Sequence, residues 1–109
     1  MKLNLNFNVE VTKEDIELII EMAGFGIDYW CYKGIVGDDY YKVYTDDGLV
    51  YKLSYYDISH GVALYIEHGN HPYNILIDEG GWKINADVID SEVADMIIQY
   101  ACFNEIIYG

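Results

Sequence analysis

The apolar residues at the start of the chain recur first with the spacing of a strand and then with the spacing of a helix. Apolar and polar residues alternate over positions 3–11, which predicts a β-strand with one buried face. Thr12 suits the N-cap of a helix, and Asp15, three residues later, completes a variant of the capping box. We expect the helix to end at Gly24 and Gly26. Its apolar residues recur at helical spacing and predict its buried face: Ile16, Ile19, Ile20 and Ala23.

The middle of the chain predicts strands followed by a second helix. Residues 28–36 are rich in aromatic and β-branched side chains, which is typical of a strand. The Asp-Gly pair at 47–48 lies between two further apolar stretches and indicates a hairpin. Ser54 is expected to cap the next helix, with Asp57 at its third position, and Gly69 to end it before a turn at 70–72. The predicted buried side of this helix is formed by Ile58, Val62, Tyr65 and Ile66.

The last third predicts a hairpin, a helix and a short strand. Residues 73–78 and 82–87 are expected to pair across a glycine-containing turn. A helix is predicted over 91–102, with either Asp87 or Asp90 as its cap. We expect the chain to finish on a strand at 105–108. In the helix, Val93, Met96, Ile97, Tyr100 and Ala101 are predicted to face inward, and Glu92, Asp95 and Gln99 outward.

This order of elements, β-α-β-β-β-α-β-β-α-β, predicts the α+β class, with three helices packed on a mixed or antiparallel sheet. The 109 residues fit one domain that covers residues 1–109. A hydrophobic fraction of 52% is sufficient for a single core, and a charged fraction of 23% excludes a disordered acidic tail.

The charge of the chain is strongly one-sided. Nineteen aspartates and glutamates stand against six lysines, arginine is absent, and the net charge is −13. We expect no direct binding to nucleic acid or to an anionic membrane, because both require cationic side chains. Such a charge favours basic protein partners. The alternating N-terminus lacks the apolar stretch of a signal peptide, so we expect a cytoplasmic protein. Cys31 and Cys102 are then expected to be reduced thiols, and the sequence does not decide whether either is reactive.

Acidic and aromatic residues are concentrated together, with six tyrosines and five aspartates among residues 38–57. Carboxylates pair with guanidinium groups and aromatic rings stack on them, which is the chemistry of an arginine-rich partner surface. One interpretation is that the carboxylates imitate the phosphates of about 22 Å of duplex. The other is an ordinary solvated acidic surface, with tyrosines chosen for the sheet and the core. The residues expected to bind the partner are Glu14, Glu17, Glu21, Asp38, Asp39, Asp46, Asp47, Tyr40, Tyr41 and Tyr44.

Metal binding and catalysis have little support in the sequence. His60, His68 and His71 lie close together, but neither a His-Glu-x-x-His nor a Cys-x-x-Cys motif is present. There is also no glycine-rich phosphate loop. We therefore expect no metal, no cofactor and no enzymatic activity.

Three stretches carry a resemblance to known proteins: TKEDIELIIEMA, IDYWC at 27–31 and IIQYACFNEIIYG at the end. They resemble a group of small acidic proteins carried by phages, prophages and conjugative elements of low-GC Gram-positive bacteria. The resemblance covers most of the chain. It implies a mobile-element setting and an anti-defence role, such as inhibition of a restriction or CRISPR nuclease, and it implies no catalytic residues.

We therefore interpret the chain as a non-enzymatic inhibitor of the DNA-mimic type, which occupies the basic nucleic-acid-binding surface of a host protein. Two alternatives stay open. The first is a protein that binds or sequesters a nucleotide-like signal, with Trp30, Trp82 and tyrosines stacked on the base. The second is a homo-oligomeric structural module, such as a homodimer with an aromatic interface.

Overall fold

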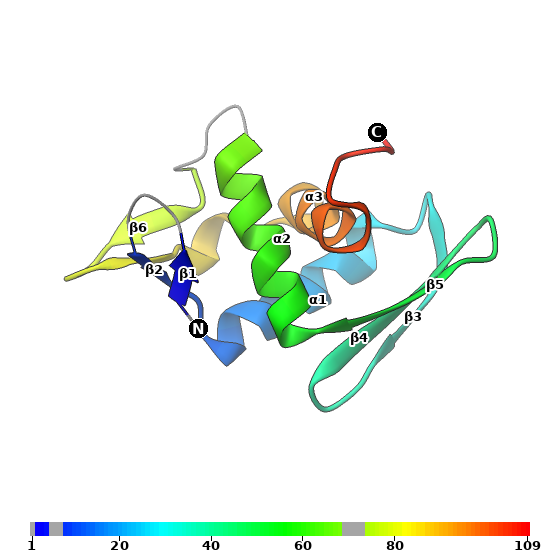
Figure 1. Cartoon of the computed structure of the whole chain (residues 1–109), viewed down its shortest axis with the longest axis horizontal. Helices are drawn as coiled ribbons and strands as arrows, with labels where there is room; N and C mark the ends of the chain where they lie inside the picture. The colour runs from blue at the N-terminus through cyan, green and yellow to red at the C-terminus, as the bar shows by residue number, and fades with distance from the viewer. Residues whose placement is uncertain (1, 5–7, 69–73) are drawn as a thin grey trace.

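The computed structural model describes residues 2–4, 8–68 and 74–109, and it has the predicted α+β fold, with three helices and two small sheets (Figure 1). In chain order the elements are β1 (Lys2–Asn4), β2 (Asn8–Glu10), α1 (Lys13–Gly26), β3 (Cys31–Val36), β4 (Tyr40–Thr45), β5 (Val50–Ser54), α2 (Tyr55–His68), β6 (Leu76–Asp78), β7 (Trp82–Ile84), the short 3-10 helix η1 (Ala86–Val88) and α3 (Ser91–Phe103).

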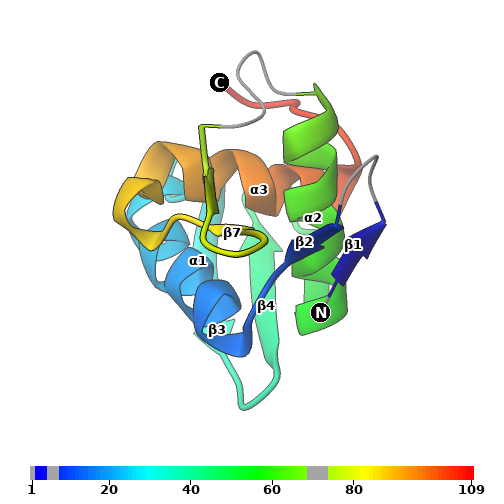
Figure 2. The same ribbon diagram turned by 90° about the vertical axis from the view of Figure 1, so that its left-hand side faces the viewer.

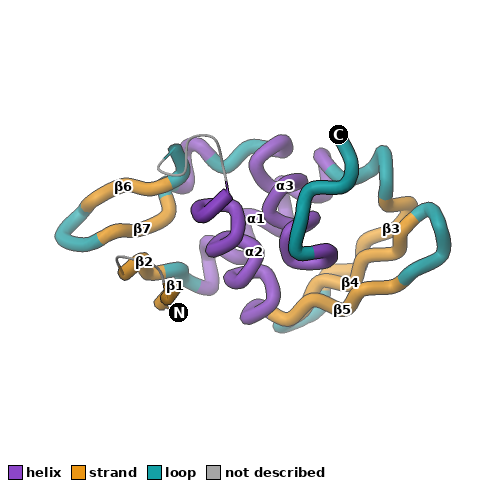
Figure 3. The backbone as a smooth tube through the Cα atoms, turned by 45° about the horizontal axis from the view of Figure 1, so that its top comes forward, coloured by secondary structure: helices purple, strands orange, loops and turns teal. Residues whose placement is uncertain are grey.

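The strands form two sheets instead of the single sheet that we expected. One has the order β1-β2-β7-β6, in which β2 and β7 are parallel and the other pairs are antiparallel. The other is an antiparallel sheet with the order β3-β4-β5. The three helices lie between the two sheets (Figures 1 and 3). In Figure 2 the strands β1, β2 and β7 lie in front of the helices, and β3 and β4 lie behind them.

The helix starts follow the sequence signals closely. The hydroxyl of Thr12 accepts the backbone N–H of Asp15 at 3.1 Å, and the Asp15 carboxylate accepts the N–H of Thr12 at 2.8 Å. The same reciprocal pair joins Ser54 and Asp57 at the start of α2. Asp90, the second of the two expected candidates, caps α3 by accepting the N–H of Val93. These capping bonds satisfy N–H groups that a helix leaves unpaired at its start.

Several predicted strands are wrong. One continuous strand was expected over 3–11, but β1 and β2 are separate antiparallel strands with Leu3 opposite Val9. Residues 28–30 form a turn before β3, because the N–H groups of Trp30 and Cys31 both bond to the carbonyl of Ile27. Residues 105–108 are not a strand. The expected helix stop at Gly69 and the turn at 70–72 lie outside the described residues.

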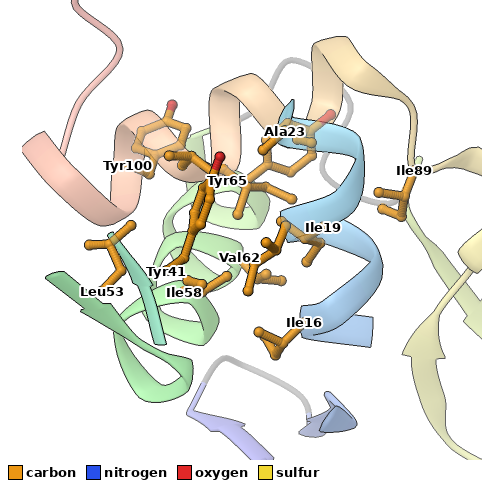
Figure 4. Close-up of a cluster of buried hydrophobic side chains, with 14 of the residues drawn as sticks. Ile16, Ile19, Ala23, Tyr41, Leu53, Ile58, Val62, Tyr65, Ile89 and Tyr100 are labelled. Atoms are coloured by element: carbon orange, nitrogen blue, oxygen red, sulfur yellow. The ribbon is translucent and has the colours of Figure 1, made fainter. Parts of the chain in front are cut away.

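The core is built where the three helices meet, and both sheets contribute buried side chains to it. All the apolar residues predicted for the buried sides of α1 and α2 are buried. Tyr41 of β4 and Leu53 of β5 point from the three-stranded sheet into this core (Figure 4). Gly61 permits a close approach of α2 to α3, because a Cβ atom added there would lie 2.5 Å from the carbonyl oxygen of Ile97.

The polar side of α3 is the main error in the predicted helix faces. Asp95 and Gln99 were expected to face outward, yet their exposed fractions are 8% and 0%. Each is hydrogen-bonded to several groups, so their burial does not leave unpaired polar atoms. Glu92, the third residue expected to face outward, is exposed.

Candidate interaction surfaces

An acidic groove lies between α1 and the turn that joins β3 to β4. Glu14, Glu17 and Glu21 are all exposed on α1, and their spacing of three and four places them along one side of the helix. Across from them, Asp38 and Asp39 are exposed in the turn. The groove has a volume of about 480 Å³ and is lined by Glu17, Ile20, Glu21, Val36, Gly37, Asp38 and Tyr55.

The groove continues along β3. A second hollow, with a volume of about 330 Å³, shares Ile20, Glu21 and Val36 with the first. It extends the lining to Asp28 at one end and to Lys33. The acidic groove therefore runs along the gap between α1 and β3, and its far part is also lined by Tyr32.

The groove combines charge with apolar surface in a way that suits long cationic side chains. Ile20 and Val36 supply apolar lining on which the methylene groups of Arg or Lys can pack. Glu17, Glu21 and Asp38 supply carboxylates for the charged ends. Glu17 also lies 3.9 Å from the amine of Lys13, but such an exposed pair contributes little and can exchange for a partner's cation.

Of the tyrosines of β4, Tyr40 and Tyr44 do not line this groove, and Tyr41 lines only the hollow along β3. Alternate side chains of a strand point to opposite faces, so Tyr40 and Tyr44 lie on the outer face while Tyr41 points toward the helices. Tyr41 is only 3% exposed, which removes it from the predicted binding surface. Burial raises the pKa of its phenol from 10.0 to about 12.

Lysines, and not carboxylates, surround the two outward tyrosines. The amine of Lys52 lies 4.5 Å from the ring centre of Tyr40. The amines of Lys33 and Lys42 lie 5.4 Å and 5.5 Å from the ring centre of Tyr44. The prediction that acids flank these rings is therefore wrong, because the acidic residues adjacent in sequence lie in the turns at the strand ends.

Asp46 and Asp47 form a separate acidic group. They lie in the β4–β5 turn, whereas Asp38 and Asp39 lie in the β3–β4 turn at the other end of the same sheet. The six-residue strand β4 between these turns spans about 20 Å. The Asp47 carboxylate also accepts a hydrogen bond from the Thr45 hydroxyl. The expected acidic residues thus make two groups and not one continuous face.

A large cavity lies beside the C-terminal residues. Its volume is about 830 Å³, and its polar lining includes Tyr29, Glu92 and Asp95. Asp95 accepts hydrogen bonds from the Tyr29 hydroxyl at 2.6 Å and from the Trp30 indole N–H at 2.8 Å. Burial and the adjacent Asp95 carboxylate raise the pKa of Tyr29 to about 12.

This cavity does not suit a nucleotide. Carboxylates in its lining repel phosphate, and Trp30, which was expected to stack on a base, is only 1% exposed. The ring of Trp30 instead stacks on Tyr108 with centroids 5.4 Å apart. Asp95 and Gln99, whose hydrogen bonds organise this region, were not predicted from the sequence. Two adjacent donors at Tyr29 and Trp30, which need acceptors when buried, were the available signal.

Candidate residues for metal binding and thiol chemistry are not gathered into a site. In the described part of the chain, no group of three His, Cys, Asp or Glu side chains is placed to hold a metal ion. His60 and His68 are exposed on α2, and His71 lies outside the described residues. Burial raises the pKa of both thiols, that of Cys102 to about 12, so each is protonated near neutral pH and is a poor nucleophile.

Comparison with known proteins matches no family model, no curated protein and no solved structure. Among the described residues, no helix has the length and apolar character that crossing a bilayer requires.

Proposed function

We propose that the protein is a non-enzymatic binding protein whose acidic groove occupies a basic, nucleic-acid-binding surface of another protein. The observation that carries this proposal is the convergence of Glu17, Glu21 and Asp38 around the apolar residues Ile20 and Val36. Elements that are distant in sequence supply these carboxylates, since Glu17 and Glu21 come from α1 and Asp38 from the β3–β4 turn.

The chemistry of the groove favours arginine and lysine side chains over other ligands. Carboxylates accept guanidinium hydrogen bonds in a two-pronged geometry, and the apolar lining covers the methylene groups. Tyr55, which also lines the groove, offers an aromatic ring to a cation. A net charge of −13 also accelerates encounter with a basic partner and makes association sensitive to salt.

The proposed contact residues differ from the set expected from the sequence. Glu14, Glu17, Glu21, Asp38 and Asp39 remain, because they lie on α1 and on the facing turn. Tyr40, Tyr41 and Tyr44 are removed, as are Asp46 and Asp47 at the other end of the sheet. The resemblance to small acidic proteins of mobile elements points to a restriction or CRISPR nuclease as the partner.

The test compares two triple variants that remove the same charge at different places. Glu17→Gln/Glu21→Gln/Asp38→Asn neutralises the groove, and Glu67→Gln/Asp87→Asn/Glu105→Gln neutralises three exposed acids elsewhere. Each protein is immobilised and exposed to lysate of a Gram-positive host at low salt, and bound proteins are eluted with a salt gradient. The eluted protein is then assayed for binding to labelled DNA.

We expect the unmodified protein and the control variant to displace DNA from the captured protein, and the groove variant to fail. The reason is that only the groove variant loses the carboxylates that replace phosphates. Retention that is independent of salt, or equal competition by the two triple variants, would show that the groove is not the binding site.

A further inference from the structure

The outer face of the β3-β4-β5 sheet carries a group of cationic and aromatic side chains. Helices α2 and α3 pack near the opposite face, into which Tyr41 and Leu53 point (Figure 4). Three of the six lysines of the chain lie on the outer face. We call this the lysine–tyrosine face and define it by Tyr32, Lys33, Tyr40, Lys42, Tyr44 and Lys52.

The positions of the lysines on this face are electrostatically unfavourable. Lys42 lies directly opposite Lys52 on the neighbouring strand, and like charges in that position destabilise a sheet. In the described part of the chain, the only ion pair joins Lys13 to Glu17, so Lys33, Lys42 and Lys52 have no carboxylate within 4.0 Å. A protein with nineteen acidic residues has thus left three lysines unneutralised on one face.

The rings of this face hold the amines in place and leave one aromatic surface exposed. The Tyr44 ring lies within 5.5 Å of the amines of Lys33 and Lys42, and cation–π attraction favours these positions. Tyr32 packs against Tyr44 with ring centres 5.9 Å apart, yet it is 65% exposed. The face therefore offers positive charge and an accessible ring side by side.

We propose that the lysine–tyrosine face binds a short segment of single-stranded nucleic acid. Lys33, Lys42 and Lys52 would contact phosphates, and Tyr32 would stack on a base. An open sheet with aromatic and basic side chains suits single strands, because their bases are free to stack. An acidic peptide would satisfy the lysines but leave the ring of Tyr32 without a planar partner, and a duplex hides the faces of its bases.

The net negative charge does not prevent this binding, but it restricts the direction of the strand. At physiological salt, charges farther than about 8 Å away are largely screened. Tyr32 and Lys33 also line the hollow that continues the acidic groove past Glu21 and Asp28, so these acids lie beyond β3, whereas Asp38, Asp39, Asp46 and Asp47 lie at the two ends of the sheet. We therefore expect the nucleic acid to cross β3, β4 and β5, a distance of about 10 Å, and not to run along the strands.

The test measures binding of fluorescein-labelled oligothymidylate and oligouridylate by anisotropy as a function of salt. Three contacted phosphates predict a slope of about −2 for log K against log salt. The double variant Lys42→Gln/Lys52→Gln should reduce this slope to about −0.7, because one contact remains. The matched control Lys13→Gln/Lys83→Gln removes the same charge elsewhere and should keep the slope.

The stacking contact is tested by a second pair of variants. Tyr32→Ala should weaken binding about fivefold or more, the usual cost of losing one stacked base. Tyr56→Ala removes a ring that is equally accessible but lies on α2, and it should leave affinity unchanged. Thermal unfolding of each variant checks that the fold is kept. Preference between the two oligonucleotides reports whether the natural ligand carries a 2′-hydroxyl.

Four results would overturn the proposal: no binding at low salt, equal affinity of the oligonucleotides and polyglutamate, equal affinity for a duplex, or an unchanged slope in Lys42→Gln/Lys52→Gln. If that variant abolished self-association in sedimentation instead, the face would be an interface between copies of this chain. The inference is independent of the proposed function, because the groove variant Glu17→Gln/Glu21→Gln/Asp38→Asn should bind oligonucleotide at least as well as the unmodified protein.

Discussion

The side-chain amide nitrogen of Gln99 donates a hydrogen bond of 3.0 Å to a carboxylate oxygen of Asp95, one turn earlier in α3. Both side chains are buried, and together they connect the start of β3 to the C-terminal residues. Asp95 receives the indole N–H of Trp30, while the oxygen of the Gln99 amide accepts the backbone N–H of Tyr108 at 2.9 Å. A polar pair inside α3 thus holds two distant segments in place.

Replacement of Asp95 by alanine should destabilise the protein substantially. The substitution leaves the buried indole N–H of Trp30 without its acceptor and removes one of the acceptors of the Gln99 amide. A lost hydrogen bond to a charged group costs about 1.5–3 kcal/mol. We expect the free energy of unfolding to fall by about 3 kcal/mol, measured by urea titration with tryptophan fluorescence. Glu92→Ala, at an exposed position of the same helix, is the control and should change stability little.

Replacement of Gln99 by leucine should release the C-terminal residues while α3 persists. The Gln99 amide accepts the N–H groups of Ile107 and Tyr108 and donates to the carbonyl of Tyr108. Leucine has a similar volume but can make none of these bonds. Hydrogen exchange at the amides of Ile107 and Tyr108 should therefore accelerate, with slow exchange retained in α2. Continued protection of both amides in the variant would show that aromatic packing of Tyr108 alone holds this segment.

Two glycine-to-alanine substitutions should have opposite effects. At Gly61 the new Cβ would lie 2.5 Å from the carbonyl oxygen of Ile97, and backbone of a packed helix cannot move aside easily. We expect a loss of about 1–3 kcal/mol from overpacking between α2 and α3. At Gly24 the new Cβ would meet no atom within 4 Å, so the higher helix propensity of alanine should add about 0.5–1 kcal/mol. Thermal unfolding of the two variants measures the sign of each change in stability. Equal shifts in melting temperature would contradict the close approach of α2 to α3 at Gly61.

The protein should lose stability in alkali partly through Tyr41. Burial raises the pKa of this phenol from 10.0 to about 12, so the folded state keeps it protonated at pH values where the unfolded chain ionises. Its contribution to stability is therefore complete below pH 10.0 and is lost as the pH rises from 10.0 toward 12. Tyr41→Phe keeps the ring but removes the ionisation.

We expect a shallower decrease of the free energy of unfolding in Tyr41→Phe than in the unmodified protein across this pH range. Tyr56→Phe, at an exposed position, serves as the control and should follow the unmodified protein. Parallel alkaline curves for all three proteins would mean that the Tyr41 phenol is accessible to solvent in the folded state.

Features that depend on neighbours within a few residues could be predicted from the sequence. The capping pairs Thr12–Asp15 and Ser54–Asp57 and the hairpin turn with a positive φ of 91° at Gly48 are of this kind. Their physical causes, unpaired helix N–H groups and a turn conformation that glycine tolerates, act locally. The apolar faces of α1 and α2 follow in the same way from helical spacing.

Only the tertiary structure decided which polar residues are buried and which charges meet. Asp95 faces inward because Tyr29 and Trp30, more than sixty positions earlier, supply its hydrogen-bond donors. Lys42 and Lys52 share a face with Tyr40 and Tyr44 because alternate residues of a strand point to the same face of the sheet. The helices cover the other face. Glu17 and Asp38 meet because α1 packs beside the β3–β4 turn. Composition does not fix where charges lie, whereas the packing of helices on a sheet gathers carboxylates beside α1 and lysines on the outer face of the sheet.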